Sequence, residues 1–280
     1  MNIKNLLNNY SKKLHFLPNT LAKLDSEILL SKVIKKDRKY LILNPQKKIN
    51  DKNIKLFDCL IERRKNREPI AYIVENKEFW KNNFYINNNV LIPRPDTEIL
   101  VEETLKLYTM NYKLKVLEIG VGSGCILLSI LKERKNFLGT GVDISKNAIN
   151  IAQFNAKVQQ LNNRVKFYIS DIDKFLIGKY DLIISNPPYI KDQDLKYLEK
   201  DIVEYEPMIA LNGGQDGLSE ITKVIKRTTV LLKKNGKFIL EIGFDQKDRV
   251  INILKNNNFY INKVVKDYAR NDRCIISTKL

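Results

Sequence analysis

From about residue 113 onward, short apolar segments alternate with longer segments of helical periodicity, and this alternation strongly constrains the fold. A short apolar run bounded by turn residues indicates a buried strand, and strands that alternate with helices predict a doubly wound α/β domain. The predicted strands are 115–119, 138–142, 165–169, 180–185 and 237–242, with a final pair at about 259–266 and 273–278. The predicted helices begin at Ser123 and Ser145 and cover 218–232 and 246–255.

The segment 1–74 has helical character and few strand signals. Apolar residues recur at helical spacing around Asp25 and Ser26, either of which would serve as an N-cap. A second amphipathic stretch covers 53–64. We therefore expect a small all-α domain at 1–74.

The segment 75–95 has a different composition, in which β-forming residues are interrupted by Asn-rich turns. It predicts one or two β-hairpins that connect the helical domain to the α/β domain at 96–280. The β-forming residues are Phe79, Trp80, Phe84, Tyr85, Ile86 and 90–92. We expect the helix that follows to be capped by Asp96 or Thr97.

The tetrapeptide Asn186-Pro187-Pro188-Tyr189 follows the predicted strand 180–185 directly. Two prolines end the strand and stiffen the turn, at the strand end where open α/β sheets bind ligands. The Asn186 side-chain oxygen and the Pro187 carbonyl can accept two hydrogen bonds, and the Tyr189 ring offers a flat face. This arrangement predicts a binding site (the NH2 grip) for a planar group that carries an NH2. The alternative is an ordinary turn after a strand, with a capping Asn.

A glycine-rich segment, Glu118-Ile119-Gly120-Val121-Gly122-Ser123-Gly124, lies between the first strand of this domain and its helix. Glycines at this position let the backbone approach a ligand closely, so we expect residues 120–124 to bind a cofactor. A tight turn without a ligand, or a site for NAD, would give the same pattern. No Lys-Ser/Thr pair follows, so the segment is not a phosphate-binding P-loop.

Two acidic residues end the next two predicted strands. Asp143 lies about 20 residues beyond the glycine-rich segment, where an acid binds ribose hydroxyls. Asp171, together with the backbone amide of Ile172, could form hydrogen bonds with the edge of an adenine. Each acid could instead cap a helix. Their joint placement favours a nucleoside, and the NH2 grip at Asn186 favours S-adenosyl-L-methionine over NAD.

The chain carries a net charge of +17, which is compatible with nucleic acid but does not require it, because Lys, Asn and Ile are abundant throughout. No apolar run approaches the ~18 residues of a membrane span, and the first 20 residues do not resemble a signal peptide, so we expect a cytoplasmic location. The three cysteines and the single His15 show no metal-ligand spacing, so we expect no metal.

Several further strings make the chain resemble the release-factor glutamine methyltransferases of the HemK type over nearly its whole length. They are Glu68-Pro69-Ile70-Ala71-Tyr72-Ile73, Glu78-Phe79-Trp80, Leu91-Ile92-Pro93-Arg94-Pro95-Asp96-Thr97-Glu98, Asp201-Ile202-Val203-Glu204-Tyr205-Glu206-Pro207, Gly213-Gly214-Gln215-Asp216-Gly217-Leu218 and Glu241-Ile242-Gly243. The Pro-Arg-Pro and Tyr-Glu-Pro strings separate this family from nucleic-acid amino-methyltransferases, which share Asn-Pro-Pro-Tyr. Glu75 and Val121 depart from the family pattern, which has Gly and Thr there.

The resemblance implies a Rossmann-like class I methyltransferase domain whose cofactor is S-adenosyl-L-methionine and whose product is S-adenosyl-L-homocysteine. It implies that the methyl acceptor is the glutamine (N5) of the Gly-Gly-Gln motif in class I peptide-chain release factors, onto which the helical domain would dock. Asn186, Pro187 and Tyr189 would be catalytic, Pro188 and Arg94 would help to bind the substrate, and Asn186 would also contact the cofactor.

Two other functions stay open at this point. The chain could methylate an amino group of adenine or cytosine in nucleic acid, which the NH2 grip and the positive charge would suit. It could also be a cofactor-binding scaffold without turnover. The internal Gly213-Gly214-Gln215 repeats the substrate tripeptide, and we interpret it as a glycine turn rather than a site of automethylation.

Overall fold

A computed structural model describes all residues of the protein, 1–280. The chain forms two compact units. The first contains Met1–Asn76 together with Glu199–Tyr205, and the second contains Lys77–Leu198 and Glu206–Leu280. The segment 199–205 therefore packs with residues that lie far before it in the sequence. No helix in either unit is long and apolar enough to cross a bilayer.

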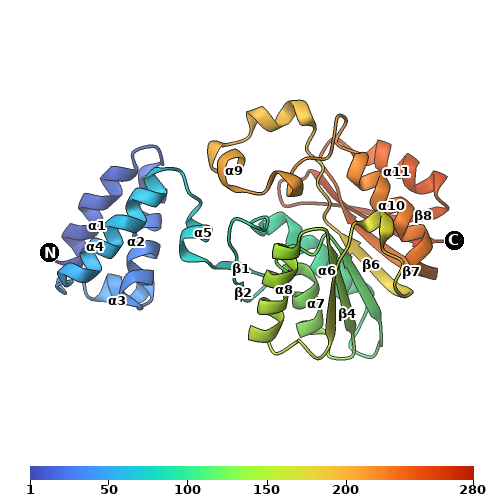
Figure 1. Ribbon diagram of the computed structural model, residues 1–280, viewed down its shortest axis with the longest axis horizontal. Coiled ribbons are helices and arrows are strands. Elements are labelled where there is room, and N and C mark those ends of the chain that lie inside the picture. The colour runs from blue at the N-terminus through green and yellow to red at the C-terminus, as the bar shows by residue number, and fades with distance from the viewer. The chain divides into compact units, whose positions relative to one another are not determined.

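The first unit is entirely helical (Figure 1), which confirms the predicted all-α region. Its helices are α1 (Ile3–Ser11), α2 (Asn19–Ile34), α3 (Arg38–Leu43), α4 (Asp51–Lys65), α5 (Ile70–Val74) and α9 (Lys200–Tyr205). Fully buried side chains from α1, α2 and α4, such as Leu6, Leu29 and Phe57, form its core. Burial of these apolar faces, rather than helix propensity alone, holds such short helices in place.

The predicted cap of α2 is wrong. The helix begins at Asn19, directly after Pro18, and both Asp25 and Ser26 lie buried inside it. The Ser26 hydroxyl donates to the Ala22 carbonyl at 2.8 Å, and the Asp25 carboxylate accepts from Arg64. Polar residues that suit a cap can equally be satisfied by partners within and beyond their helix, and periodicity does not reveal those partners.

Arg64 on α4 is the centre of a buried ionic cluster. Its Nε donates to Asp25 and its Nη1 donates to Asp201 on α9, both at 2.8 Å. The Arg64 side chain is only 7% exposed. Tyr205 at the end of α9 also donates to the Asn66 carbonyl. These bonds explain why 199–205 belongs to the helical unit.

The second unit is an α/β domain with a seven-stranded sheet in the order β5-β4-β3-β6-β7-β9-β8 (Figure 1). The strands are β3 (Lys115–Ile119), β4 (Leu138–Asp143), β5 (Val165–Ile169), β6 (Tyr180–Ser185), β7 (Leu232–Glu241), β8 (Phe259–Lys266) and β9 (Asp272–Lys279). The first five are parallel, and β9 pairs antiparallel with both β7 and β8. The helices are α6 (Glu98–Leu107), α7 (Cys125–Glu133), α8 (Lys146–Val158), α10 (Ser219–Leu231) and α11 (Lys247–Asn256). This architecture confirms the predicted doubly wound fold.

The strand order places a switch point at β3. The chain moves from β3 to β4 on one side and later returns to β6 on the other, so the loops after β3 and β6 diverge. Ligands bind at such points in open α/β sheets. The glycine-rich segment follows β3 and the Asn186 segment follows β6, so the fold brings the two strongest sequence motifs to one place.

The connection before the sheet is a single hairpin that belongs to the second unit. Strand β1 (Lys77–Phe79) pairs antiparallel with β2 (Asn82–Phe84). The other β-forming residues of this segment, Tyr85, Ile86 and 90–92, form no strand. A short 3-10 helix, Pro95–Thr97, precedes α6, and Thr97 occupies the N-cap position of α6 without a capping side-chain bond. Its hydroxyl instead accepts a hydrogen bond from Asn186, so the predicted capping role of Thr97 is wrong.

Candidate functional site

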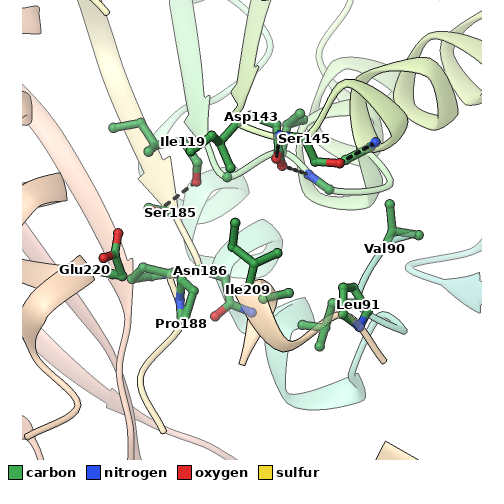
Figure 2. Close-up of a pocket in the computed structure, with 18 of the residues that line it drawn as sticks. Val90, Leu91, Ile119, Asp143, Ser145, Ser185, Asn186, Pro188, Ile209 and Glu220 are labelled. Carbon is green, nitrogen blue, oxygen red and sulfur yellow. Dashed lines mark hydrogen bonds between the residues drawn. The ribbon is translucent and has the colours of Figure 1, made fainter. Parts of the chain in front are cut away.

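A cavity of about 550 Å³ lies at the carboxyl ends of β3, β4 and β6 (Figure 2). The loops that follow these strands supply much of its wall, and Val90, Leu91, Pro93 and Arg94 supply another part. Residues 170–172 after β5, residues 207–210, Asn212, Gly214 and the first two turns of α10 also line the cavity. All of these residues belong to the second unit. The volume is that of a typical small-molecule site.

The glycine-rich loop is fixed to the end of β4. The amides of Gly120 and Val121 donate to the Val142 carbonyl at 2.9 and 3.1 Å. Gly120 and Gly122 have φ values of +73° and +53°, and a Cβ at either would meet no atom within 4 Å. The backbone conformation therefore favours glycine at both positions, and the space beside the loop is open to a ligand. The buried Ser123 hydroxyl next to them lacks a hydrogen-bond partner of normal geometry.

Asp143 lies where the sequence places it, at the end of β4 and in the wall of the cavity. One carboxylate oxygen accepts from the Gly122 amide and the other from the Ser145 amide, both at 2.9 Å. Ser145, rather than Asp143, caps α8 by accepting from the Ala148 amide at 3.2 Å (Figure 2). Burial raises the pKa of Asp143, and the backbone amides oppose that rise. A carboxylate has about four acceptor positions, so Asp143 can still accept from a hydroxyl of a ligand.

Asp171 and Ile172 also line the cavity, after β5. The Asp171 carboxylate accepts from the Asp173 amide at 3.0 Å and caps the short 3-10 helix Ile172–Lys174. The capping role that the sequence left open is thus present. It does not exclude a ligand role, because the pair still faces the cavity.

Asn186, Pro187 and Pro188 line the cavity at the end of β6. The Asn186 Nδ2 donates to the Thr97 hydroxyl oxygen at 3.2 Å. This bond directs the nitrogen of the amide to Thr97 and leaves the Oδ1 atom as an acceptor. The neighbouring Ser185 hydroxyl donates to the Ile119 carbonyl at 2.9 Å and ties the end of β6 to β3.

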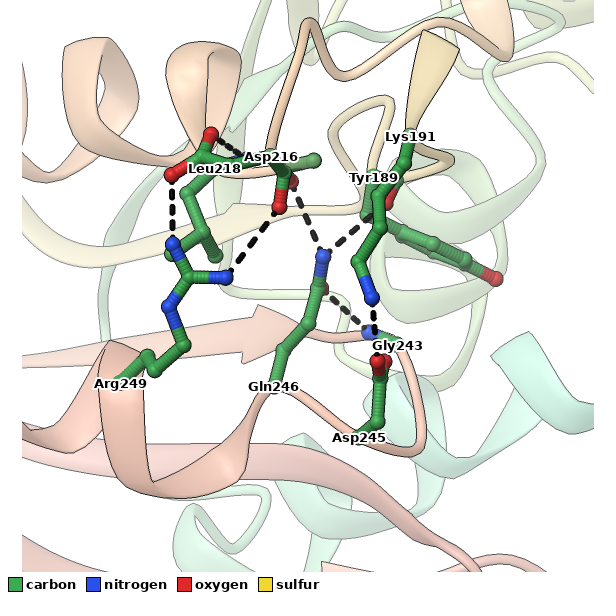
Figure 3. A network of polar contacts seen from close by, with 9 residues as sticks. Tyr189, Lys191, Asp216, Leu218, Gly243, Asp245, Gln246 and Arg249 are labelled. Carbon is green, nitrogen blue, oxygen red and sulfur yellow. Dashed lines mark hydrogen bonds and ion pairs between the residues drawn. The ribbon is translucent and has the colours of Figure 1, made fainter. Parts of the chain in front are cut away.

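Tyr189 does not belong to the lining of the cavity. Its hydroxyl donates to Glu241 at 3.4 Å, and its ring packs against the core of the unit. Its carbonyl accepts from Gln246 at 2.9 Å, and the same Gln246 amide group donates to Gly217 at 3.0 Å (Figure 3). The Gly243 amide donates to the Gln246 oxygen at 2.9 Å. These bonds hold the turn behind the prolines, and a role of the Tyr189 ring as a platform for substrate stays a prediction.

Arg94 lines the cavity and forms an ion pair with Glu206. The Glu206 side chain is 1% exposed and also accepts from the Ile92 amide at 3.1 Å. Arg94 therefore joins the loop before α6 to the segment that enters the cavity wall at Pro207. Contact of Arg94 with a substrate stays a prediction.

Sequence reasoning missed several residues of the site. Thr97, Met208 and Ile209 lie inside or next to the strings that signalled the family, so their neighbourhood was visible in the sequence. Glu220 and Lys223 on α10 also line the cavity and carry no local signal. The fold alone brings this helix, more than 30 residues beyond Asn186, to the same place.

Comparisons with known proteins agree with this architecture. Residues 5–74 match the family described as the PrmC N-terminal domain, and residues 95–215 match the methyltransferase small domain. A release factor glutamine methyltransferase of Clostridium acetobutylicum is 41% identical over 91% of this chain and 90% of its own length. One of Buchnera aphidicola subsp. Acyrthosiphon pisum is 38% identical over 100% of this chain and 99% of its own length.

Among solved structures, a methyltransferase of Pyrococcus furiosus superposes with a TM-score of 0.53 at 18% identity. The match covers 70% of this chain and 88% of that one. It supports the α/β architecture of the second unit.

Proposed function

The chain belongs to the release factor glutamine methyltransferase family, and we propose that it methylates the side-chain amide nitrogen of the glutamine in the Gly-Gly-Gln motif of class I peptide-chain release factors. The observation that carries this proposal is the orientation of Asn186. Its nitrogen is bound to Thr97, and its oxygen is left for a ligand in the same cavity as the glycine-rich loop.

S-adenosyl-L-methionine is the methyl donor that the residues of the cavity fit. The open space beside Gly120 and Gly122 and the buried Ser123 hydroxyl suit a ligand that lies against the loop backbone. Asp143 would hold the ribose hydroxyls, and Asp171 with the Ile172 amide would hold the adenine. When bound, the cofactor supplies an electrophilic methyl group on a sulfonium.

The protein's contribution to the reaction is positional and electrostatic. An amide nitrogen is a poor nucleophile because its lone pair is delocalised into the carbonyl. The Asn186 Oδ1 and the Pro187 carbonyl would each accept a hydrogen bond from one of the two N–H groups of the substrate amide. These bonds orient the nitrogen and increase its electron density. The Tyr189 ring would support the amide plane. The nitrogen becomes strongly acidic once it carries the methyl group, and it then loses a proton.

Different segments of the chain would bind the release factor and transfer the methyl group. We propose that the helical domain, 1–74, docks on the release factor, that 75–95 connects it, and that 96–280 carries out methyl transfer. The match of residues 5–74 to the PrmC N-terminal domain supports this division. A release factor acts on the ribosome, so the enzyme would work in the cytoplasm.

Methyl transfer from labelled S-adenosyl-L-methionine tests this proposal when purified release factor and total nucleic acid are offered in parallel. Label on the release factor is the expected result. Label on nucleic acid would preserve the cofactor site but refute the substrate, in favour of the amino-methyltransferase that the +17 charge would suit. Cofactor binding without label on either would indicate a scaffold.

A further inference from the structure

Glu241 is a buried carboxyl group directly behind the candidate catalytic segment. It is the last residue of β7, which pairs with β6 so that Leu240 lies opposite Ser185. The residue is 2% exposed. It does not line the cavity, so it would not touch a ligand there.

Two groups of the site converge on this carboxyl. The Tyr189 hydroxyl donates to its Oε1 atom at 3.4 Å. The Thr97 hydroxyl also acts on this carboxyl and lowers its pKa. Because the Thr97 oxygen accepts from Asn186, the hydroxyl hydrogen is available to Glu241. A path of polar groups therefore runs from Asn186 through Thr97 to Glu241.

The carboxyl is only partly compensated. Its Oε2 atom is buried and has no hydrogen-bond partner of normal geometry. The Arg273 guanidinium lowers the pKa of Glu241, but its hydrogen bonds go to Asp267 at 3.0 and 3.1 Å and to the Ile242 carbonyl at 3.3 Å. A buried and incompletely paired carboxyl destabilises a fold relative to an apolar or amide side chain of similar size. Stability does not account for this residue, whereas a role in the site does.

We propose that Glu241 is a positioning residue for the methyl transfer proposed above, on which this inference rests. Its negative charge orients the Thr97 hydroxyl, which in turn holds the Asn186 nitrogen and turns Oδ1 toward the substrate amide. The same charge polarises the Asn186 amide through the Thr97 hydroxyl, so that Oδ1 accepts more strongly. The substrate nitrogen thereby gains electron density when the methyl group is transferred.

The ionised form of Glu241 is the active one, so turnover depends on pH. Burial raises the pKa of Glu241 to about 7, against the lowering effects of Thr97, Arg273 and Tyr189 and with a further rise from Asp96. The neighbouring thiols Cys125 and Cys274 stay neutral, because burial raises the pKa of each. We therefore expect kcat to fall as pH decreases through about 7, as the carboxylate gains a proton.

The test compares Glu241→Gln with the wild-type enzyme, because Gln keeps the size of the side chain and removes the charge. Loss of an outer partner of a functional side chain lowers activity by roughly 10- to 100-fold in well-studied metal sites, and we expect a similar fall in kcat here. The KM for the release factor and the Kd for S-adenosyl-L-methionine should change by less than about threefold. The decline of kcat below about pH 7 should disappear in the variant.

Variants of Thr97 provide matched controls. Thr97→Val keeps the shape and removes the hydroxyl, and it removes no helix cap because the Thr97 side chain makes no capping bond. It should lower kcat about as much as Glu241→Gln, whereas Thr97→Ser should retain most of the activity. The double variant Glu241→Gln, Thr97→Val should be no slower than the slower single variant, because both act through one path.

Three outcomes separate the possibilities. A Glu241→Gln enzyme with unchanged kcat and an unchanged pH profile would overturn the inference. So would a loss in Glu241→Gln that is matched by a lower melting temperature, while Thr97→Val keeps wild-type kcat, because Glu241 would then only support the fold. Failure of the wild-type enzyme to methylate any release factor would overturn the proposed function itself, and the inference with it.

Discussion

Replacement of Asn186 by Ala removes the acceptor on which the proposed mechanism depends. The Pro187 carbonyl stays in place, so one of the two expected hydrogen bonds to the substrate amide is retained. Deletion of a single preorganised hydrogen-bonding group in an active site costs about 3 kcal/mol of transition-state stabilisation. This corresponds to a decrease in kcat of roughly 150-fold. The change also removes the bond from Nδ2 to Thr97, but at the edge of a cavity this should affect the fold little.

Single-turnover methyl transfer at saturating cofactor and release factor measures the chemical step directly. Cofactor binding, followed by calorimetry, should weaken much less than turnover. Asn186→Asp is the matched variant, since it keeps the size of the side chain but loses the Nδ2 donor to Thr97 and adds a charge near the sulfonium. It should also be slow. A methylation rate of Asn186→Ala equal to that of the wild type would refute the mechanism.

Three further changes test the structure elsewhere. Arg64→Ala leaves the buried Asp25 unpaired and should lower the free energy of unfolding of the helical unit by about 3–5 kcal/mol in urea titrations. The control Arg63→Ala removes an exposed ion pair and should lower it by less than about 1 kcal/mol. Equal effects of the two variants would contradict the burial of the Arg64 ion pair. Glu75→Gly removes the strain of a left-handed backbone with φ +58°, so it should raise the free energy of unfolding of the helical unit by about 1 kcal/mol. A decrease in that free energy would contradict the left-handed conformation at residue 75. Asp143→Ala should weaken cofactor binding in calorimetry by roughly 10- to 100-fold through loss of charged hydrogen bonds, and an unchanged Kd would exclude Asp143 from the cofactor site.

The sheet was predictable wherever the pattern of a strand is local. The strand 165–169 matches its predicted bounds, because an apolar alternation ends at clear turn residues on both sides. Strand β7 begins at Leu232 rather than at 237, since Lys233, Lys234 and Asn235 give no strand signal and pairing with β6 extends it. Helix α7 begins at Cys125 rather than at Ser123 because Gly124 adopts a left-handed conformation before it.

The site residues that lie in short motifs directly after a strand were predictable from the sequence. Residues 120–123, Asp143 and Asn186 all lie in the cavity because each follows a strand whose end faces the switch point. Gly124, which we also expected to bind the cofactor, does not line the cavity, and it packs beside Leu128 and Ala152 instead. The partners of these residues were not predictable. Thr97 reaches Asn186 across 89 positions, and Arg64 reaches Asp201 across 137. Such contacts arise from the packing of distant elements, and no periodicity in the sequence records them.

The central claim concerns one nitrogen atom in one tripeptide of the substrate. Tandem mass spectrometry of a release factor incubated with the enzyme and S-adenosyl-L-methionine tests it most directly, with the enzyme itself digested in parallel. The account predicts a single added methyl group, located on the side chain of the glutamine in Gly-Gly-Gln, and no methyl group on Gln215 of the enzyme. A methyl group on another residue of the release factor, or none on that glutamine at full cofactor occupancy, would contradict it.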